Sequence, residues 1–410
     1  MVSQPINKFS FLSDRIDENL VILFPILNAI STIIVPYTND GILNIGIIRA
    51  FIIIAFSMYF LLYKFDTRFN LSTISLFFLL YILFCVLISS DFFVGFNVYF
   101  KFFVATMHLL FGLYYGSRPF FMKRISISIL IMLGIYILDF ILSNLFNFGT
   151  VSYVGVENEF KFGGSGVNLA KCVSAILLIM PLLFYEFKSK IFKRILIILT
   201  IAGIVHILFA FKRSGLFSLF IGYFIILLFY PNPLKKIQFG FRILLFAVLL
   251  TPLIYEQVID NYNAREKAIR LDDEDNLEEQ ARYVEYQMGI NEWERQSLDY
   301  KLFGAEIFNS RLYFNIRRTF HTDYMTLLVG SGVIGVLILF IYYYSMVKTL
   351  WQKKNRFKTE LNDLQFAIGL ALVVSMILYG LSGLVQAIEP RATILLFIGA
   401  LIARPAFPKT

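Results

Sequence analysis

The sequence has few cysteines, few histidines and little charge, and each shortage excludes a class of protein. Its two cysteines, Cys85 and Cys172, lie inside apolar runs, so neither a disulfide framework nor a thiolate metal site is available. The three histidines, His108, His206 and His321, are scattered along the chain. Only 16% of the residues are charged, whereas soluble domains have about 25%. The low charge, together with the apolar excess described next, excludes a soluble enzyme.

Apolar and aromatic side chains take the place of the missing charge. Hydrophobic residues make up 58% of the 410 residues, the mean hydropathy is +0.72, and there are 46 Phe and 23 Tyr. A water-soluble fold of this size could not bury that excess, whereas lipid-facing and interfacial surfaces accept it. The sequence therefore predicts an all-α polytopic membrane protein.

Twelve apolar runs are predicted to be membrane-spanning helices. The predicted spans are 20–36, 43–63, 72–89, 98–116, 126–144, 166–187, 195–211, 216–230, 243–258, 323–346, 363–385 and 392–405. An even number of spans puts both termini on the same side of the membrane. Lysine and arginine concentrate in every second short loop, which predicts that the N- and C-termini are cytoplasmic. The net charge of +9 therefore reflects membrane topology and does not indicate nucleic-acid binding.

One long segment interrupts the short connections. Residues 259–322 are predicted to be external and hold nine Lys or Arg against thirteen Asp or Glu. A structureless loop of this length is unusual, so we expect it to fold as a cap. Asp275 is a candidate N-cap of a helix in which Ala281, Val284 and Met288 share one face. The chain is thus divided into spans one to nine (1–258), the cap (259–322) and spans ten to twelve (323–410).

Cations outside the cytoplasmic loops need an explanation, because charge is costly at membrane depth. The candidates near the outer ends of spans or within them are Arg49, Lys101, Lys171, Lys212, Arg213 and Arg391, and the cap adds Arg282, Arg311, Arg317, Arg318 and His321. Gathered in one cleft, they would form a strong anion site, since the planar guanidinium binds phosphate oxygens in pairs. Two alternatives stay open: Lys101 could extend to the interface, and Arg282 could pair with Glu278 or Glu285 on its own helix.

His321 stands where the cap meets span ten, shortly after Arg317 and Arg318. A single histidine at a helix start is usually structural. Two neighbouring cations favour the neutral imidazole, however, and that form can accept a proton near pH 7. His321 is therefore a candidate general base.

Four stretches carry a resemblance to a known family. FKRSGLFSLFIG (211–222) opens a span with basic residues and a serine, and ARYVEYQMGINEWERQSLDYKLFGAE (281–306) has an arginine leading a helix that LFG closes. HTDYMTLLVGSGVIG (321–335) has a histidine, a polar residue, and then small residues at Gly332 and Gly335. EPRATILLF (389–397) opens the last span with an arginine. In this order and spacing, over about residues 166 to 405, the chain resembles the superfamily of O-antigen polymerases (Wzy-type) and O-antigen ligases (WaaL-type).

The resemblance implies a GT-C-like membrane glycosyltransferase of the bacterial inner membrane, with the cap in the periplasm. Its donor is a glycan linked to undecaprenyl diphosphate, and no metal ion or other cofactor is implied. Arginines would bind the diphosphate: Arg213, Arg282 and Arg391 first, with Arg318 and Lys212 next. His321 would be the general base or would position the acceptor. A chain-length-determining co-polymerase is the expected protein partner.

Two kinds of alternative remain beside a polymerase that joins lipid-linked repeat units by metal-independent, inverting transfer. A ligase would transfer the glycan to lipid A core, but Thr322 stands where ligases favour Asn, Ser or Gln, and the acidic cap is unlike theirs. A transporter or flippase of lipid-linked sugar is consistent with twelve spans. It has less support, because the two halves of the chain differ in loop size and convincing coupling carboxylates are lacking.

Overall fold

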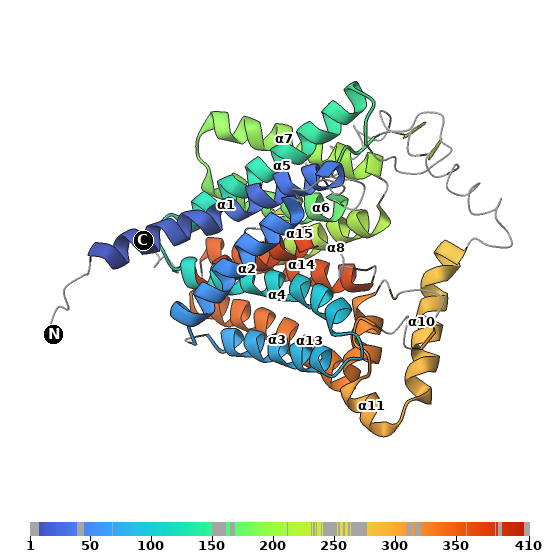
Figure 1. The fold of residues 1–410 in the computed structure, drawn as a ribbon. Helices are drawn as coiled ribbons and strands as arrows, with labels where there is room; N and C mark the ends of the chain where they lie inside the picture. The colour runs from blue at the N-terminus through green and yellow to red at the C-terminus, as the bar shows by residue number, and fades with distance from the viewer. Residues whose placement is uncertain are drawn as a thin grey trace.

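The computed structural model is a bundle of α-helices (Figure 1). It describes residues 8–38, 45–67, 69–149, 161–164, 169–210, 212–230, 277–309, 314–315, 320, 322–357, 359–381, 383 and 388–405, with short pieces between 232 and 263, and without the side chains of 8–14 and 277–284. The helices are α1 (Lys8–Thr38), α2 (Ile45–Tyr63), α3 (Asn70–Leu87), α4 (Phe92–Tyr115), α5 (Phe121–Leu145), α6 (Ala170–Glu186), α7 (Lys190–Ala210), α8 (Arg213–Phe229), α10 (Leu277–Arg295), α11 (Leu298–Phe303), α13 (Asp323–Arg356), α14 (Glu360–Leu381) and α15 (Ile388–Ala403). Within these residues the β-structure is one isolated bridge between Gly149 and Gly163.

Eight of these helices are long and apolar enough to cross a membrane: α1 to α5, α7, α13 and α14. α8 is a shorter apolar helix, and α6 and α15 have 17 and 16 residues. The chain is therefore an all-α protein with the composition of a polytopic membrane protein. Twelve spans remain a prediction, because most of the predicted span 243–258 lies outside the described residues.

The centre of the bundle is built on a close contact between α4 and α15. A Cβ atom on Gly112 would lie 2.3 Å from the carbonyl oxygen of Leu396, and one on Gly399 would lie 2.4 Å from that of Leu109. Small residues at a helix contact let backbones approach closely, as is common between membrane helices. All of α15 from Pro390 onward is buried. A charged side chain at the start of α15 is therefore central in the protein.

The two ends of the bundle differ. One end we call the cap end: α3 ends there, α4 and α15 begin there, and α10 and α11 lie there. Figure 1 shows α10 standing across this end. At the opposite end Asp17 lies 3.7 Å from Lys64, and Glu18 lies 3.4 Å from Arg118 and 2.9 Å from Arg124. These pairs tie α1 to the helix ends beside it.

α10 covers part of the cap end with an apolar face, at the position where the sequence predicts a helix. Met288 and Trp293 pack on a small cluster formed by Phe320, Met325 and Val329. Met288 belongs to the predicted apolar face. The side chains of its two predicted companions, at 281 and 284, lie outside the described residues. The contact attaches α10 to the first part of α13.

Candidate functional site

α13 is sharply folded at Gly332. This residue has φ 64° and ψ −173°, which is not helical, although helix lies on both sides of it. The rings of Tyr324 and Phe340 stack with centroids 5.9 Å apart, whereas sixteen residues of straight helix would separate them by about 24 Å. The sequence predicts one continuous span over 323–346. The structure instead has two helical arms, and the first arm turns back from Gly332 toward the interior.

The fold at Gly332 is made by contact with the end of α11. A Cβ atom on Gly332 would lie 2.3 Å from the carbonyl oxygen of Leu302, and one on Gly304 would lie 2.3 Å from the nitrogen of Ser331. Gly304 also has a positive φ, 84°. Only glycine tolerates both conditions without strain. Two of the stretches that carry the family resemblance, 281–306 and 321–335, are thus in direct backbone contact.

Polar backbone groups released by this fold have partners. The Ala305 N–H donates to the carbonyl oxygen of Val329 at 2.9 Å, and the Tyr81 hydroxyl donates to that of Ser331 at 2.9 Å. Non-helical backbone at membrane depth is tolerated where the protein itself satisfies it. The break in α13 is therefore stabilised by hydrogen bonds that join α13 to α3 and to the segment after α11.

The first arm of α13 carries Asp323 to a buried ion pair with Arg391 at the start of α15. The exposed fractions of the two side chains are 2% and 6%. The Arg391 guanidinium also lies over the ring of Phe102, 4.4 Å from its centroid. Phe102 packs on Phe78, which stacks on Tyr342 at 5.5 Å. Phe78 is nine residues, about 13 Å, from the end of α3, so the pair lies well inside the bundle.

Thr322 begins this arm as its N-cap. Its side-chain oxygen accepts from the Met325 N–H at 3.3 Å, and threonine is among the preferred residues for that role. Ser and Asn would serve equally well. Local capping therefore gives a physical reason for a small polar residue directly after His321.

A second ion pair lies two residues before the first on α15. Glu389 accepts from Arg49 at 3.1 Å and from the Thr32 hydroxyl at 3.0 Å. Arg49 also donates to the Ser31 hydroxyl at 3.0 Å. The start of α15 thus connects α1 and α2 through Glu389, and α4 and α13 through Arg391.

α6, α8 and α14 meet beside this network at the cap end. Lys171, near the start of α6, donates to the carbonyl oxygen of Gly383 at 3.0 Å and lies 5.7 Å from the ring centroid of Tyr379. Gly215 on α8 would place a Cβ atom 3.4 Å from the carbonyl oxygen of Ala170. The first turn of α8 therefore lies against the first turn of α6.

Three of the predicted diphosphate ligands lie at the cap end. Arg391 is the buried partner of Asp323 described above. Lys212 is the N-cap residue of α8 and is partly buried, and Arg213, the first residue of α8, is exposed. The structure therefore places these three cations at one end of the bundle.

The other predicted site residues fall in less described parts of the chain. Arg282 lies in the first half of α10, but its side chain is outside the described residues. Arg318 and the candidate base His321 also lie outside them. Their contacts stay predictions.

The sequence interpretation missed the carboxylates of the site. Asp323 and Glu389 each pair with a candidate cation, yet neither was singled out. Both stand beside or within apolar runs, where an acidic residue is costly unless it is paired. An acidic residue in an apolar run is a signal that the sequence contains, but the sequence does not indicate which cation pairs with Asp323 or Glu389.

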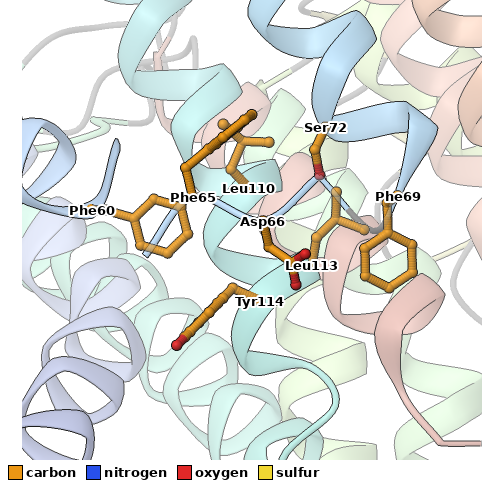
Figure 2. A pocket seen from close by; sticks show the side chains of 8 residues that line it. All are labelled: Phe60, Phe65, Asp66, Phe69, Ser72, Leu110, Leu113 and Tyr114. Carbon is orange, nitrogen blue, oxygen red and sulfur yellow. The ribbon is translucent and has the colours of Figure 1, made fainter. Parts of the chain in front are cut away.

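A small pocket lies away from these residues. Figure 2 shows Asp66 and Ser72 among aromatic and aliphatic side chains where α2 ends, α3 begins and α4 ends, which is the opposite end of the bundle. Its lining residues are Phe60, Phe65, Asp66, Phe69, Ser72, Leu110, Leu113 and Tyr114. None of the predicted site residues contributes to this pocket.

In the part of the chain that the structure describes, no three His, Cys, Asp or Glu side chains gather as metal ligands would. The arrangement at the cap end is cationic: Arg49 and Arg391 are held by two carboxylates, and Lys171 by a carbonyl oxygen and an aromatic ring. Such a set suits the binding of phosphate oxygens. No protein-family model matches the chain, and no curated protein matches it.

Proposed function

We propose that the protein is a glycosyltransferase that polymerises oligosaccharide repeat units carried on undecaprenyl diphosphate. A hydroxyl of the acceptor glycan attacks the anomeric carbon of the donor glycan, and the bond from that carbon to the diphosphate breaks. A glycosidic bond forms, the lipid diphosphate leaves, and the hydroxyl proton passes to His321. The reaction takes place at the periplasmic face of the bacterial inner membrane, and the chain has cytoplasmic termini and a GT-C-like arrangement of twelve spans.

One observation carries the proposal: three of the four stretches that resemble the polymerase and ligase superfamily meet at the cap end. Segment 281–306 docks on segment 321–335 through Gly304 and Gly332. Segment 321–335 is joined to segment 389–397 by the Asp323–Arg391 pair. Segment 389–397 lies more than 50 residues beyond the other two in the sequence, and a shared site is a physical reason for all three to carry the resemblance.

Diphosphate chemistry assigns a task to the cations at this end. The leaving group is already good, so the protein mainly has to stabilise the negative charge that develops on it and to position the acceptor. A guanidinium has five N–H donors, and one carboxylate oxygen does not use them all. Arg391 can therefore be oriented by Asp323 and still bind phosphate oxygens, together with Arg213 and Arg282.

The experiment uses the purified full chain in detergent with undecaprenyl-diphosphate repeat units of its own host, and no lipid A core. The expected product is a ladder of lengthening glycans on a gel, absent for His321→Ala at equal protein level. A general base contributes about 10²- to 10⁴-fold to a rate, so the loss should be large while donor binding persists.

Transfer only after lipid A core is added would identify a ligase instead. No product with either acceptor would refute glycosyl transfer and favour a lipid-linked sugar transporter. A normal ladder from His321→Ala would leave the polymerase intact but remove His321 from its mechanism. Products of controlled length are expected only when the co-polymerase partner is added.

A further inference from the structure

Lys101 is a cation at the depth of the buried network, and among the described residues its ammonium has no hydrogen-bond or ion-pair partner. It lies on α4 directly before Phe102, whose ring makes a cation–π contact with the Arg391 guanidinium. Glu389 attracts it electrostatically, but no hydrogen bond or ion pair joins its ammonium to any of the described residues. Its side chain is partly buried.

The charges around Lys101 do not balance. The two nearby carboxylates each have an arginine: Glu389 has Arg49 at 3.1 Å, and Asp323 has Arg391. Lys101 is then the cation in excess in this set. An ammonium at membrane depth is costly without a counter-charge, and such residues usually serve a function.

Extension of the side chain to the interface does not readily explain Lys101. It is the tenth residue of α4, so about 14 Å of helix separates it from the first residue, Phe92. A lysine stem covers only part of that distance. Lys171, another lysine of this end, has a carbonyl oxygen and an aromatic ring as partners. Lys101 has neither among the described residues.

We propose that Lys101 is an anion-binding residue and that its anion is the diphosphate of a polyprenyl lipid. This inference rests on the proposed function and adds a contact that the sequence alone did not favour. The lipid chain keeps the diphosphate at membrane depth, where Lys101 lies within electrostatic reach of Glu389 and next in sequence to Phe102, whose ring contacts the Arg391 guanidinium. An ammonium acts there as a compact point charge with three donors, while Arg391 supplies the planar group.

The test measures binding of farnesyl diphosphate to the purified full chain in lipid nanodiscs, with farnesol and inorganic diphosphate as comparison probes. Lys101→Met keeps the apolar stem and removes the charge, and Lys101→Arg restores a charge. Lys193→Met is the matched control, because Lys193 is an exposed lysine at the start of α7, at the opposite end. Loss of one charge-assisted contact predicts that Lys101→Met raises the Kd for farnesyl diphosphate about tenfold or more.

Lys101→Arg should recover most of the affinity, Lys193→Met should bind like the unmodified chain, and farnesol binding should not respond to any of the changes. An unchanged Kd in Lys101→Met would overturn the proposal. Inorganic diphosphate that binds as tightly as the farnesyl form would overturn its assignment to a lipid. Thermal stability separates a structural role: Lys101→Met removes an unpaired charge, so an unfolding midpoint clearly below that of the unmodified chain would also contradict the proposal.

The two hypotheses fail separately. If Lys101→Met loses farnesyl diphosphate binding and the unmodified chain makes no glycan, the anion site is supported and glycosyl transfer is refuted. A glycan ladder from Lys101→Met with the KM for the donor unchanged would keep glycosyl transfer and refute the site.

Discussion

Arg391 and Asp323 are 68 residues apart in the chain and form an ion pair inside the bundle. The pair joins the first arm of α13 to the start of α15, and the ring of Phe102 covers the guanidinium. Removing two charges from water is unfavourable, and only good geometry with additional contacts compensates for it. Here the pair holds the cation of the candidate site in one orientation.

The pair predicts a non-additive response to mutation. Asp323→Leu and Arg391→Met each leave one buried charge without its partner, so each should lower the unfolding free energy by about 3–5 kcal/mol. The double variant removes both charges and should lose clearly less than the sum. Unfolding free energies of the four proteins in one detergent system measure this coupling. Simple additivity would show that the two side chains do not stabilise each other.

Gly332 should not tolerate a side chain. Gly332→Ala forces a Cβ atom to within 2.3 Å of the carbonyl oxygen of Leu302 at a positive φ. The expected loss is about 2 kcal/mol or more. Gly134→Ala is the matched control, because a Cβ atom there meets nothing within 4 Å. Alanine is the better helix former, so the control should be neutral or slightly stabilising. Equal unfolding midpoints for the two variants would contradict the close contact.

The helices could largely be predicted from the sequence, because the length of an apolar run reflects local composition. The predicted span 43–63 matches α2 (Ile45–Tyr63), and 363–385 matches α14 (Glu360–Leu381) within a few residues. The fold within α13 could not be predicted in the same way. It depends on the contact of Gly332 with Leu302, and hydrophobic patterning does not reveal contacts between distant segments.

The candidate site shows the same division. Because a charge in an apolar environment is energetically costly, the sequence alone indicates that Arg391 has a function. Its pairing with Asp323 and its place over Phe102 follow from how α4, α13 and α15 pack, and no short motif states that. Lys101 and Lys171 both belong to the candidate cations of the sequence, and only the structure shows that Lys171 has local partners.

Glu306 should hold the end of α11 to the loop between α3 and α4. Its carboxylate accepts from the Ser89 hydroxyl at 2.8 Å, the Ser90 N–H at 3.0 Å and the Ser90 hydroxyl at 2.9 Å. Glu306→Gln replaces one acceptor oxygen with a donor and removes the charge, which should weaken the attachment by about 1–3 kcal/mol. Amide hydrogen exchange of residues 298–309 should then accelerate, while exchange in α14 stays constant. Unchanged exchange would mean that α11 is held by its glycine contacts alone.

Arg213 and Arg282 should affect donor affinity as well as rate. Each is proposed to contact the diphosphate in both the bound donor and the transition state, so Arg213→Ala and Arg282→Ala should each raise donor KM and lower kcat/KM about tenfold or more. Arg194→Ala, an exposed arginine on α7 at the opposite end, is the control. Donor kinetics at fixed acceptor measure the effect. An unchanged donor KM would place the diphosphate elsewhere.

The new glycosidic bond should have the anomeric configuration opposite to that of the donor. A diphosphate leaves readily, so direct attack by the acceptor hydroxyl requires no covalent glycosyl-enzyme intermediate, and a single displacement inverts the carbon. Retention would require a carboxylate nucleophile at the sugar. Asp323, the carboxylate nearest to the predicted base in sequence, is buried and held by Arg391, so it is poorly placed for that role. NMR of the product formed from a donor of known configuration measures the outcome. A retained anomer would contradict direct attack and make Asp323 or Glu389 a candidate nucleophile.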